Sequence, residues 1–187
     1  MDEFSYLSIL LSIILGLAVT QVLTGFRGLL QSRARVRVYW PTIAWACIAL
    51  VICAQTWWAM FDLRAYHAWT FAGFAIVLFH LICLYMFAAL VLPDFPPDQP
   101  VDLRAFYFAQ HRWIGALVVV AACVSLSKDL VLHGRLPDRV NVVFHLVFIV
   151  AAGASAITRA EWFHKLLVLA ISVLFALYIV LLFASLR

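Results

Sequence analysis

Six long apolar runs occupy most of the 187 residues of this chain, and they constrain its fold more than any other feature. They cover residues 4–30, 39–61, 69–92, 105–127, 137–158 and 161–186. An apolar helix needs about 20 residues to cross the hydrocarbon of a bilayer, and each run is of this order. The strands of a barrel would alternate apolar and polar residues, and none of the runs does so. Backbone groups in lipid must be paired within their own segment. The sequence therefore predicts an all-α, polytopic transmembrane bundle of six helices, forming a single domain over residues 1–187.

Composition excludes the soluble classes of protein. Apolar residues make up 67% of the chain and charged residues 12%, whereas soluble domains carry about 25% charged residues. The mean hydropathy is +1.06. A water-soluble domain of this size could not hide so much apolar surface, so we expect the lipid bilayer to be its main partner. The basic residues form no stripe interleaved with exposed aromatics, so we expect no nucleic-acid partner.

The basic residues between the runs predict the orientation of the bundle. One side holds eight of them: Arg27, Arg33, Arg35, Arg37, Arg104, Arg112, Arg159 and Lys165. The other side holds five: Arg64, Lys128, Arg135, Arg139 and Arg187. The positive-inside rule then places both termini on the outer side. Eleven of the thirteen basic residues are arginine, which agrees with a GC-rich bacterial genome. We therefore expect a bacterial inner (cytoplasmic) membrane protein with both termini in the periplasm.

The one long polar linker, residues 93–100, contains four prolines and should be extended rather than helical. Three carboxylates lie in or next to it, at Asp94, Asp98 and Asp102. They could form a cation site, but a solvated acidic face is the simpler interpretation.

Two helical hairpins share an ordered set of residues, which suggests an internal repeat. Trp45, Asp62, His67 and His80 follow one another at intervals of 17, 5 and 13 residues. Trp113, Asp129, His133 and His145 follow at 16, 4 and 12. A duplicated hairpin of this kind would relate the second and third helices to the fourth and fifth by a parallel repeat. Chance similarity between aromatic-rich apolar segments is the alternative.

The first run carries a small or hydroxylated residue at every fourth position. The set is Ser8, Ser12, Gly16, Thr20, Thr24 and Gly28. Small residues at this spacing allow close helix approach, so they predict a helix-packing ridge. The segment 151–156 predicts a second close contact for the same reason. An alternative is a polar path across the membrane, lined by Ser12, Thr20, Gln21, Thr24, Gln55 and His80.

Two histidines near the middle of their runs, His80 and His145, are the candidate cofactor ligands. Their depths differ by about three residues, or roughly 4.5 Å at 1.5 Å per residue, so helix tilt could let them hold a haem b between two imidazoles. The alternative is a pair of neutral histidines hydrogen-bonded to neighbouring helices. The other histidines lie near the ends of the runs, where an interfacial position explains them. The four cysteines, Cys47, Cys53, Cys83 and Cys123, show no metal-ligand spacing, so we expect no metal site.

Charged residues are absent from the middle of every run, which argues against an ion-coupled pump. Asp62, Lys128 and Asp129 fall at the outer ends, where Lys128 could pair with Asp62. Glutamate occurs only at positions 3 and 161, and no hydrolase or phosphate-loop motif is present, so we expect no enzyme. The sequence favours a passive, oligomeric channel or permease for a small neutral or weakly charged solute. The alternatives are a non-catalytic accessory subunit of a larger membrane complex and a haem-binding electron-transfer subunit.

Overall fold

The computed structural model describes residues 3–97 and 99–182, and six helices dominate it. They are α1 (Glu3–Gln31), α2 (Trp40–Ala59), α3 (Phe71–Leu90), α4 (Leu103–His133), α5 (Arg139–Ile157) and α6 (Glu161–Leu182). Two 3-10 segments, η1 (Arg33–Arg35) and η2 (Met60–Ala65), and two short strands, β1 (Val36–Arg37) and β2 (Val101–Asp102), join them. All six helices are long and apolar enough to cross a bilayer. The all-α bundle of six spanning helices is thus confirmed, and the chain is a multi-pass helical membrane protein.

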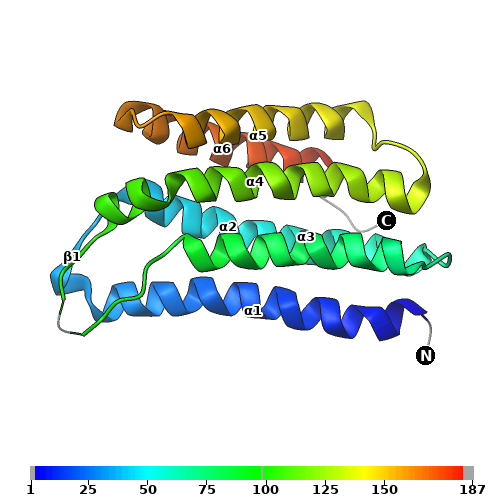
Figure 1. The fold of residues 1–187 in the computed structure, drawn as a ribbon, viewed down its shortest axis with the longest axis horizontal. Coiled ribbons are helices and arrows are strands. Elements are labelled where there is room, and N and C mark those ends of the chain that lie inside the picture. The colour runs from blue at the N-terminus through cyan, green and yellow to red at the C-terminus, as the bar shows by residue number, and fades with distance from the viewer. Residues whose placement is uncertain (1–2, 98, 183–187) are drawn as a thin grey trace.

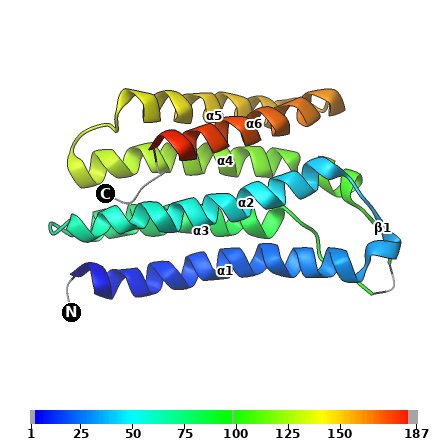
Figure 2. The same ribbon diagram turned by 180° about the vertical axis from the view of Figure 1, so that it is seen from behind.

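The helices run along one common axis in Figure 1, with α1 on one side and α5 and α6 on the other. Helices α2, α3 and α4 lie between them, and the view from behind shows the same order (Figure 2). Helix α3 packs against α1 and α4, while α6 packs against α5 and α2. One end of the bundle holds β1, β2 and the turn from α5 to α6, and we call it the strand end. The opposite end holds the start of α1, η2 and the turn from α4 to α5, and we call it the terminal end.

Helix α4 is longer than the sequence predicted, so Lys128 and Asp129 lie within the helix and not beyond its end. The apolar run ends at 127, but the helix continues to His133 and is terminated by Gly134 in the left-handed conformation, with φ 65°. The polar residues of its last turns are therefore helical and not in a loop, because an amphipathic turn can continue a helix beyond its apolar stretch. Helix α5 starts after the N-cap Asp138, so Pro137 lies outside the helix. Of the sixth predicted run, residues 183–186 lie outside the described residues.

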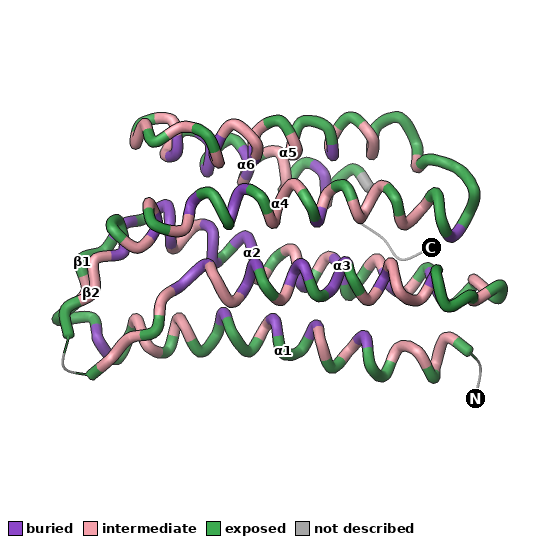
Figure 3. The backbone as a smooth tube through the Cα atoms, viewed as in Figure 1, coloured by how far each residue is buried: buried purple, intermediate pink, exposed green. Residues whose placement is uncertain are grey.

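The first helix buries a stripe of apolar residues and leaves much of its polar row outside. The buried residues of α1 are Leu11, Leu15, Ala18 and Val22, and Figure 3 shows them on the side that faces α3. Within the predicted ridge Gly16, Thr20 and Thr24 are exposed, and a Cβ atom on Gly16 would meet nothing within 4 Å.

Close contact of α1 with the rest of the bundle is concentrated near its strand end. A Cβ atom on Gly28 would stand 2.6 Å from Phe95, and one on Gly25 would stand 2.8 Å from Leu92. Gly28 belongs to the predicted ridge and Gly25 does not. The positions where α1 comes closest to the rest of the bundle therefore lie on its inward face. Of the glycines in the predicted ridge, Gly28 lies on that face and Gly16 does not.

The second predicted contact segment is confirmed. Gly115 of α4 faces it, because an added Cβ would lie 2.8 Å from the carbonyl oxygen of Ala152 and 2.9 Å from Ser155 Oγ. Helices α4 and α5 are in extensive contact. Small residues on both helices allow this approach.

Candidate functional site

A cavity of about 350 Å³ lies inside the bundle, enclosed by helices α2 to α6. Its polar lining is Gln55, Thr56, Asp62, His80, Ser125, Lys128, Asp129, His133, Asn141, His145 and Tyr178. Its apolar lining includes Trp45, Ile48, Leu84, Phe87, Leu117, Val118, Phe148, Ile171 and Phe175. Helix α1 contributes no lining residue. The cavity therefore belongs to the five-helix part of the bundle and α1 packs outside it.

The cavity is elongated and its polarity changes along its length. On α4 it extends from Leu117 to His133, which at 1.5 Å per residue corresponds to about 24 Å along the helix. Toward the strand end its walls are aliphatic and aromatic, and toward the terminal end they carry charged and amide groups. An elongated occupant would therefore place an apolar part toward Trp45 and a polar part toward the terminal end.

The mouth of the cavity lies at the terminal end, where two of its lining residues, Asp62 and His133, are exposed. Asp129 Oδ1 lies 3.7 Å from His133 Nδ1, one turn further along α4. Lys128 also lines the cavity, and within residues 3–97 and 99–182 no ion pair joins it to Asp62 or to another carboxylate. The predicted pair between Lys128 and Asp62 is therefore not formed, and this ammonium group is available to an occupant of the cavity.

His80 on α3 and His145 on α5 both line the cavity, deeper than the charged mouth. His145 Nδ1 lies 2.9 Å from the carbonyl oxygen of Asn141. His80 is 9% exposed, and its Nδ1 is buried without a hydrogen-bond partner among the described residues. The sequence singled out these two histidines together, and the structure brings both to one cavity.

A directed chain of hydrogen bonds closes the cavity toward the strand end. Trp45 lines the cavity, and its Nε1–H donates to the Tyr107 hydroxyl oxygen over 3.3 Å. The Tyr107 hydroxyl lies 2.9 Å from His164 Nδ1, and His164 Nε2 lies 3.0 Å from the carbonyl oxygen of Thr158. A carbonyl can only accept, so Nε2 carries the proton of a neutral His164 and Nδ1 accepts from Tyr107. Every bond in the chain then has one donor and one acceptor.

A second buried histidine, His111, packs against this chain. Its ring centroid is 5.6 Å from that of His164, and its Nδ1 donates to the Phe108 carbonyl oxygen over 2.8 Å. Its Nε2 has no partner among the described residues, nor does the buried hydroxyl of Tyr39. Burial raises the pKa of Tyr39 to about 12, so that hydroxyl keeps its proton.

The interfacial role expected for these end histidines is wrong for two of them, because His111 is 2% and His164 0% exposed. The four-residue spacing of Tyr107 and His111 is the sequence feature that indicates their burial on a shared face, since residues four apart lie on one side of a helix.

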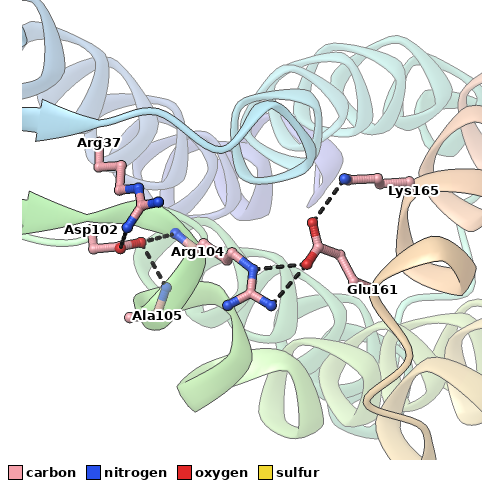
Figure 4. A network of polar contacts seen from close by, with 6 residues as sticks. All are labelled: Arg37, Asp102, Arg104, Ala105, Glu161 and Lys165. Carbon is pink, nitrogen blue, oxygen red and sulfur yellow. Dashed lines mark hydrogen bonds and ion pairs between the residues drawn. The ribbon is translucent and has the colours of Figure 1, made fainter.

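An ion-pair network braces the strand end, as Figure 4 shows. Arg104 donates from Nε to Glu161 Oε2 over 2.8 Å, and Lys165 Nζ lies 2.7 Å from Glu161 Oε1. Arg37 lies 3.6 Å from Asp102, whose carboxylate caps α4 by accepting from the amides of Arg104 and Ala105. These bonds and the neighbouring arginines hold the pKa of Asp102 below its usual 3.8. Asp102 is thus a helix cap whose side chain is still 36% exposed, and β1–β2 pairing positions it beside Arg37.

The six residues of the predicted polar path are not brought together. Gln55 and His80 line the cavity, but Ser12, Thr20, Gln21 and Thr24 lie on α1, outside it. The hydroxyl groups of Ser12 and Thr20 donate to carbonyl oxygens of their own helix, at Ser8 and Gly16. Gln21 donates to the Tyr85 hydroxyl over 3.3 Å. Periodicity revealed a polar row on α1 but could not reveal which helix faces the cavity.

Cofactor binding has one candidate arrangement, the pair His80 and His145. In the described part of the chain no three His, Cys, Asp or Glu side chains come together as a metal site. The cavity of about 350 Å³ has room for about twelve groups the size of a water molecule, at about 30 Å³ each. Haem binding by this pair stays a prediction.

The two hairpins of the predicted repeat contribute unequally to the cavity. The aspartates Asp62 and Asp129 and the histidines His80 and His145 all line it. Trp45 is 2% exposed, however, whereas its counterpart Trp113 is 66% exposed. The duplication stays a prediction, and the α2–α3 and α4–α5 hairpins face one cavity from different sides.

No protein-family model, curated protein or solved structure matches this chain. The class of protein therefore follows from the fold and the cavity alone: a polytopic helical membrane protein with a cavity inside its helical bundle.

Proposed function

We propose that the chain is a passive permease for a small neutral or weakly charged solute. The observation that carries this proposal is the cavity, which opens at one end of the bundle and is closed at the other by the Trp45–Tyr107–His164 chain. A solute would enter from the terminal end and leave when that closing layer separates. The sequence places no Asp, Glu, Lys or Arg in the middle of any apolar run, which argues against an ion-coupled carrier.

The mouth chemistry limits the charge of the solute. It holds both signs, because Lys128, Asp129 and Asp62 all line the cavity. A strongly charged solute of either sign would meet repulsion from one of these groups, whereas a neutral or weakly charged one would not. The apolar walls beyond favour a solute with an apolar part.

We propose that the strand end faces the cytoplasm of a bacterial inner membrane and that both termini and the cavity mouth face the periplasm. The strand end carries the larger group of arginines, including Arg33, Arg35 and Arg37. Lys128 lies in the cavity and not in a loop, which increases the contrast in loop charge between the two ends. The positive-inside rule supports this orientation.

Reconstitution into liposomes tests the permease. Uptake of labelled neutral and weak-acid solutes should exceed that of empty liposomes and should need no ion gradient. Ala122 lines the cavity, so Ala122→Phe should fill part of the cavity and abolish uptake. The neighbouring Cys123 is exposed, so Cys123→Phe should leave uptake unchanged. Liposomes impermeable to every solute, or equal uptake by the two variants, would contradict the proposal.

We propose that the protein works as an oligomer, or as an accessory subunit of a larger complex, that associates through α1. Gly16, Thr20 and Thr24 form an exposed row of small side chains with free space around Gly16, and such rows support close helix contact. A stable homo-oligomer after purification would favour the permease over the accessory role, and Gly16→Leu should dissociate it. An oligomer that Gly16→Leu does not affect would show that α1 is not the interface.

A further inference from the structure

The two histidines of the cavity each leave one ring nitrogen unsatisfied. A neutral imidazole has one donor and one acceptor nitrogen. His145 Nδ1 donates to the Asn141 carbonyl oxygen over 2.9 Å, so its Nε2 is an acceptor. Within the described residues no group donates to that nitrogen, and none partners His80 Nδ1. His80 Nδ1 is fully buried, whereas His145 Nε2 is not, so His145 carries the acceptor that an occupant of the cavity can reach.

Lys128 adds the complementary group. It lines the same cavity as His80 and His145. The ammonium can only donate, whereas the free nitrogen of His145 can only accept. A group that satisfies both must donate and accept at once.

This requirement separates the common polar groups. A carboxylate or an ether only accepts, so it would leave His145 unsatisfied. An ammonium group only donates and would be repelled by Lys128. A hydroxyl group donates one hydrogen and accepts others. The wall beside the histidines is aromatic, with Phe148, Phe175 and Tyr178, and aromatic rings pack well against one another.

We propose that the cavity binds a phenolic amphiphile, with its hydroxyl between His145 and Lys128 and its apolar tail toward Trp45. This proposal rests on the permease function and names its substrate class. The cavity volume of about 350 Å³ lies at the lower end of the range of about 300–1,000 Å³ that is usual for small-molecule pockets, which suits one aromatic ring with a short chain. The phenol O–H donates to His145 Nε2 and its oxygen accepts from the Lys128 ammonium.

The test compares two probes that differ in the hydroxyl alone, para-pentylphenol and its methyl ether, para-pentylanisole. The full chain is placed in lipid nanodiscs, and binding is measured by equilibrium dialysis against empty nanodiscs. The phenol should bind at least about tenfold more tightly, which is the equivalent of one good hydrogen bond. Equal affinities of the wild-type protein for the two probes would overturn the proposal.

Variants locate the hydroxyl. His145→Phe should reduce the preference for the phenol to about one while leaving ether affinity in place, and the retained ether binding reports that the variant is folded. His133→Phe, at the exposed mouth, should keep the preference. If His145→Phe fails to fold, His145→Leu serves as the second variant and should also remove the preference, whereas Lys128→Met should weaken the binding of both probes alike, because either oxygen can accept from the ammonium. A preference that survives in a folded His145 variant would place the hydroxyl elsewhere and refute the assignment.

The outcome is independent of transport. A wild-type preference for the phenol without any uptake into liposomes would support the binding site and contradict the permease. Uptake of small solutes without a preference for the phenol would support the permease and contradict the substrate class.

Discussion

Gly115 of α4 lies so close to α5 that a Cβ atom on it would stand 2.8 Å from the carbonyl oxygen of Ala152. A backbone oxygen cannot rotate away as the end of a side chain can. The two helices that carry Lys128 and His145 are therefore held together at a point where no side chain fits between them. This contact fixes the width of the cavity on that side.

Gly115→Ala should destabilise the bundle by about 1–3 kcal/mol, because the added methyl group must push α4 and α5 apart. The matched control is Gly153→Ala on α5, where a Cβ would meet nothing within 4 Å. The control should be neutral or stabilising by up to about 1 kcal/mol. Unfolding in detergent micelles measures both, and equal stabilities would show that the close contact is not needed.

On α1 the same comparison uses Gly25 and Gly16. Gly25→Ala would bring a Cβ within 2.9 Å of Leu92 Cβ, whereas Gly16→Ala meets open space. We expect Gly25→Ala to lower the thermal unfolding midpoint and Gly16→Ala to leave the monomer unchanged. A larger loss from Gly16→Ala in monomeric protein would contradict the arrangement of α1 described above.

Tyr107→Phe should cost about 1–3 kcal/mol, because it leaves the Trp45 N–H and His164 Nδ1 buried without partners. Tyr85→Phe is the control, since its hydroxyl only accepts one bond from Gln21 at 3.3 Å and the residue is half-buried. Chemical unfolding compares the two. In the permease assay Tyr107→Phe should also raise uptake, since it weakens the layer that closes the cavity, and unchanged uptake would argue against that layer as the closure.

Asp102→Ala should destabilise the protein by about 1 kcal/mol at neutral pH through loss of the α4 cap. The pKa of Asp102 is lowered in the folded protein, so its contribution is fully present above the unfolded value near 4 and disappears as the pH falls through the folded value. The difference between wild type and Asp102→Ala should therefore shrink only below about pH 4. Asp94→Ala, an exposed carboxylate with no bond or ion pair to another described residue, is the control. A difference that is unchanged at the lowest pH would contradict a capping role for the carboxylate.

Several features could be predicted from local sequence because local chemistry causes them. The length of each apolar run predicts a spanning helix, and the small residues of 151–156 predict a helix contact that the structure contains. Apolar length alone predicts too short an α4, because polar turns continue the helix to His133, and Gly134 is the residue in the sequence that indicates its end. The β1–β2 pairing was also missed, since two-residue strands from distant loops leave no periodicity.

The candidate site was harder to predict for a geometric reason. A polar row on a helix has the same spacing whether it faces a cavity, a neighbour or lipid. The row on α1 therefore looked like a path, yet none of its residues lines the cavity. The position of His80 and His145 near the middle of their apolar runs predicts their depth in the membrane, because depth depends only on the number of residues along each helix.

The sequence by itself determined that the chain is a six-helix membrane protein, because bilayer thickness and backbone pairing leave apolar segments of this length no other form. Only the tertiary structure decided that α1 packs outside the cavity, that Lys128 and Asp129 line it, and that Tyr107 and His164 close it. The physical reason is that helix neighbours are chosen by the fit of side chains from segments far apart in the chain. Gly115 against Ala152 is one such fit: the small residues 151–156 predict a close contact, but only the structure shows that Gly115 is the partner.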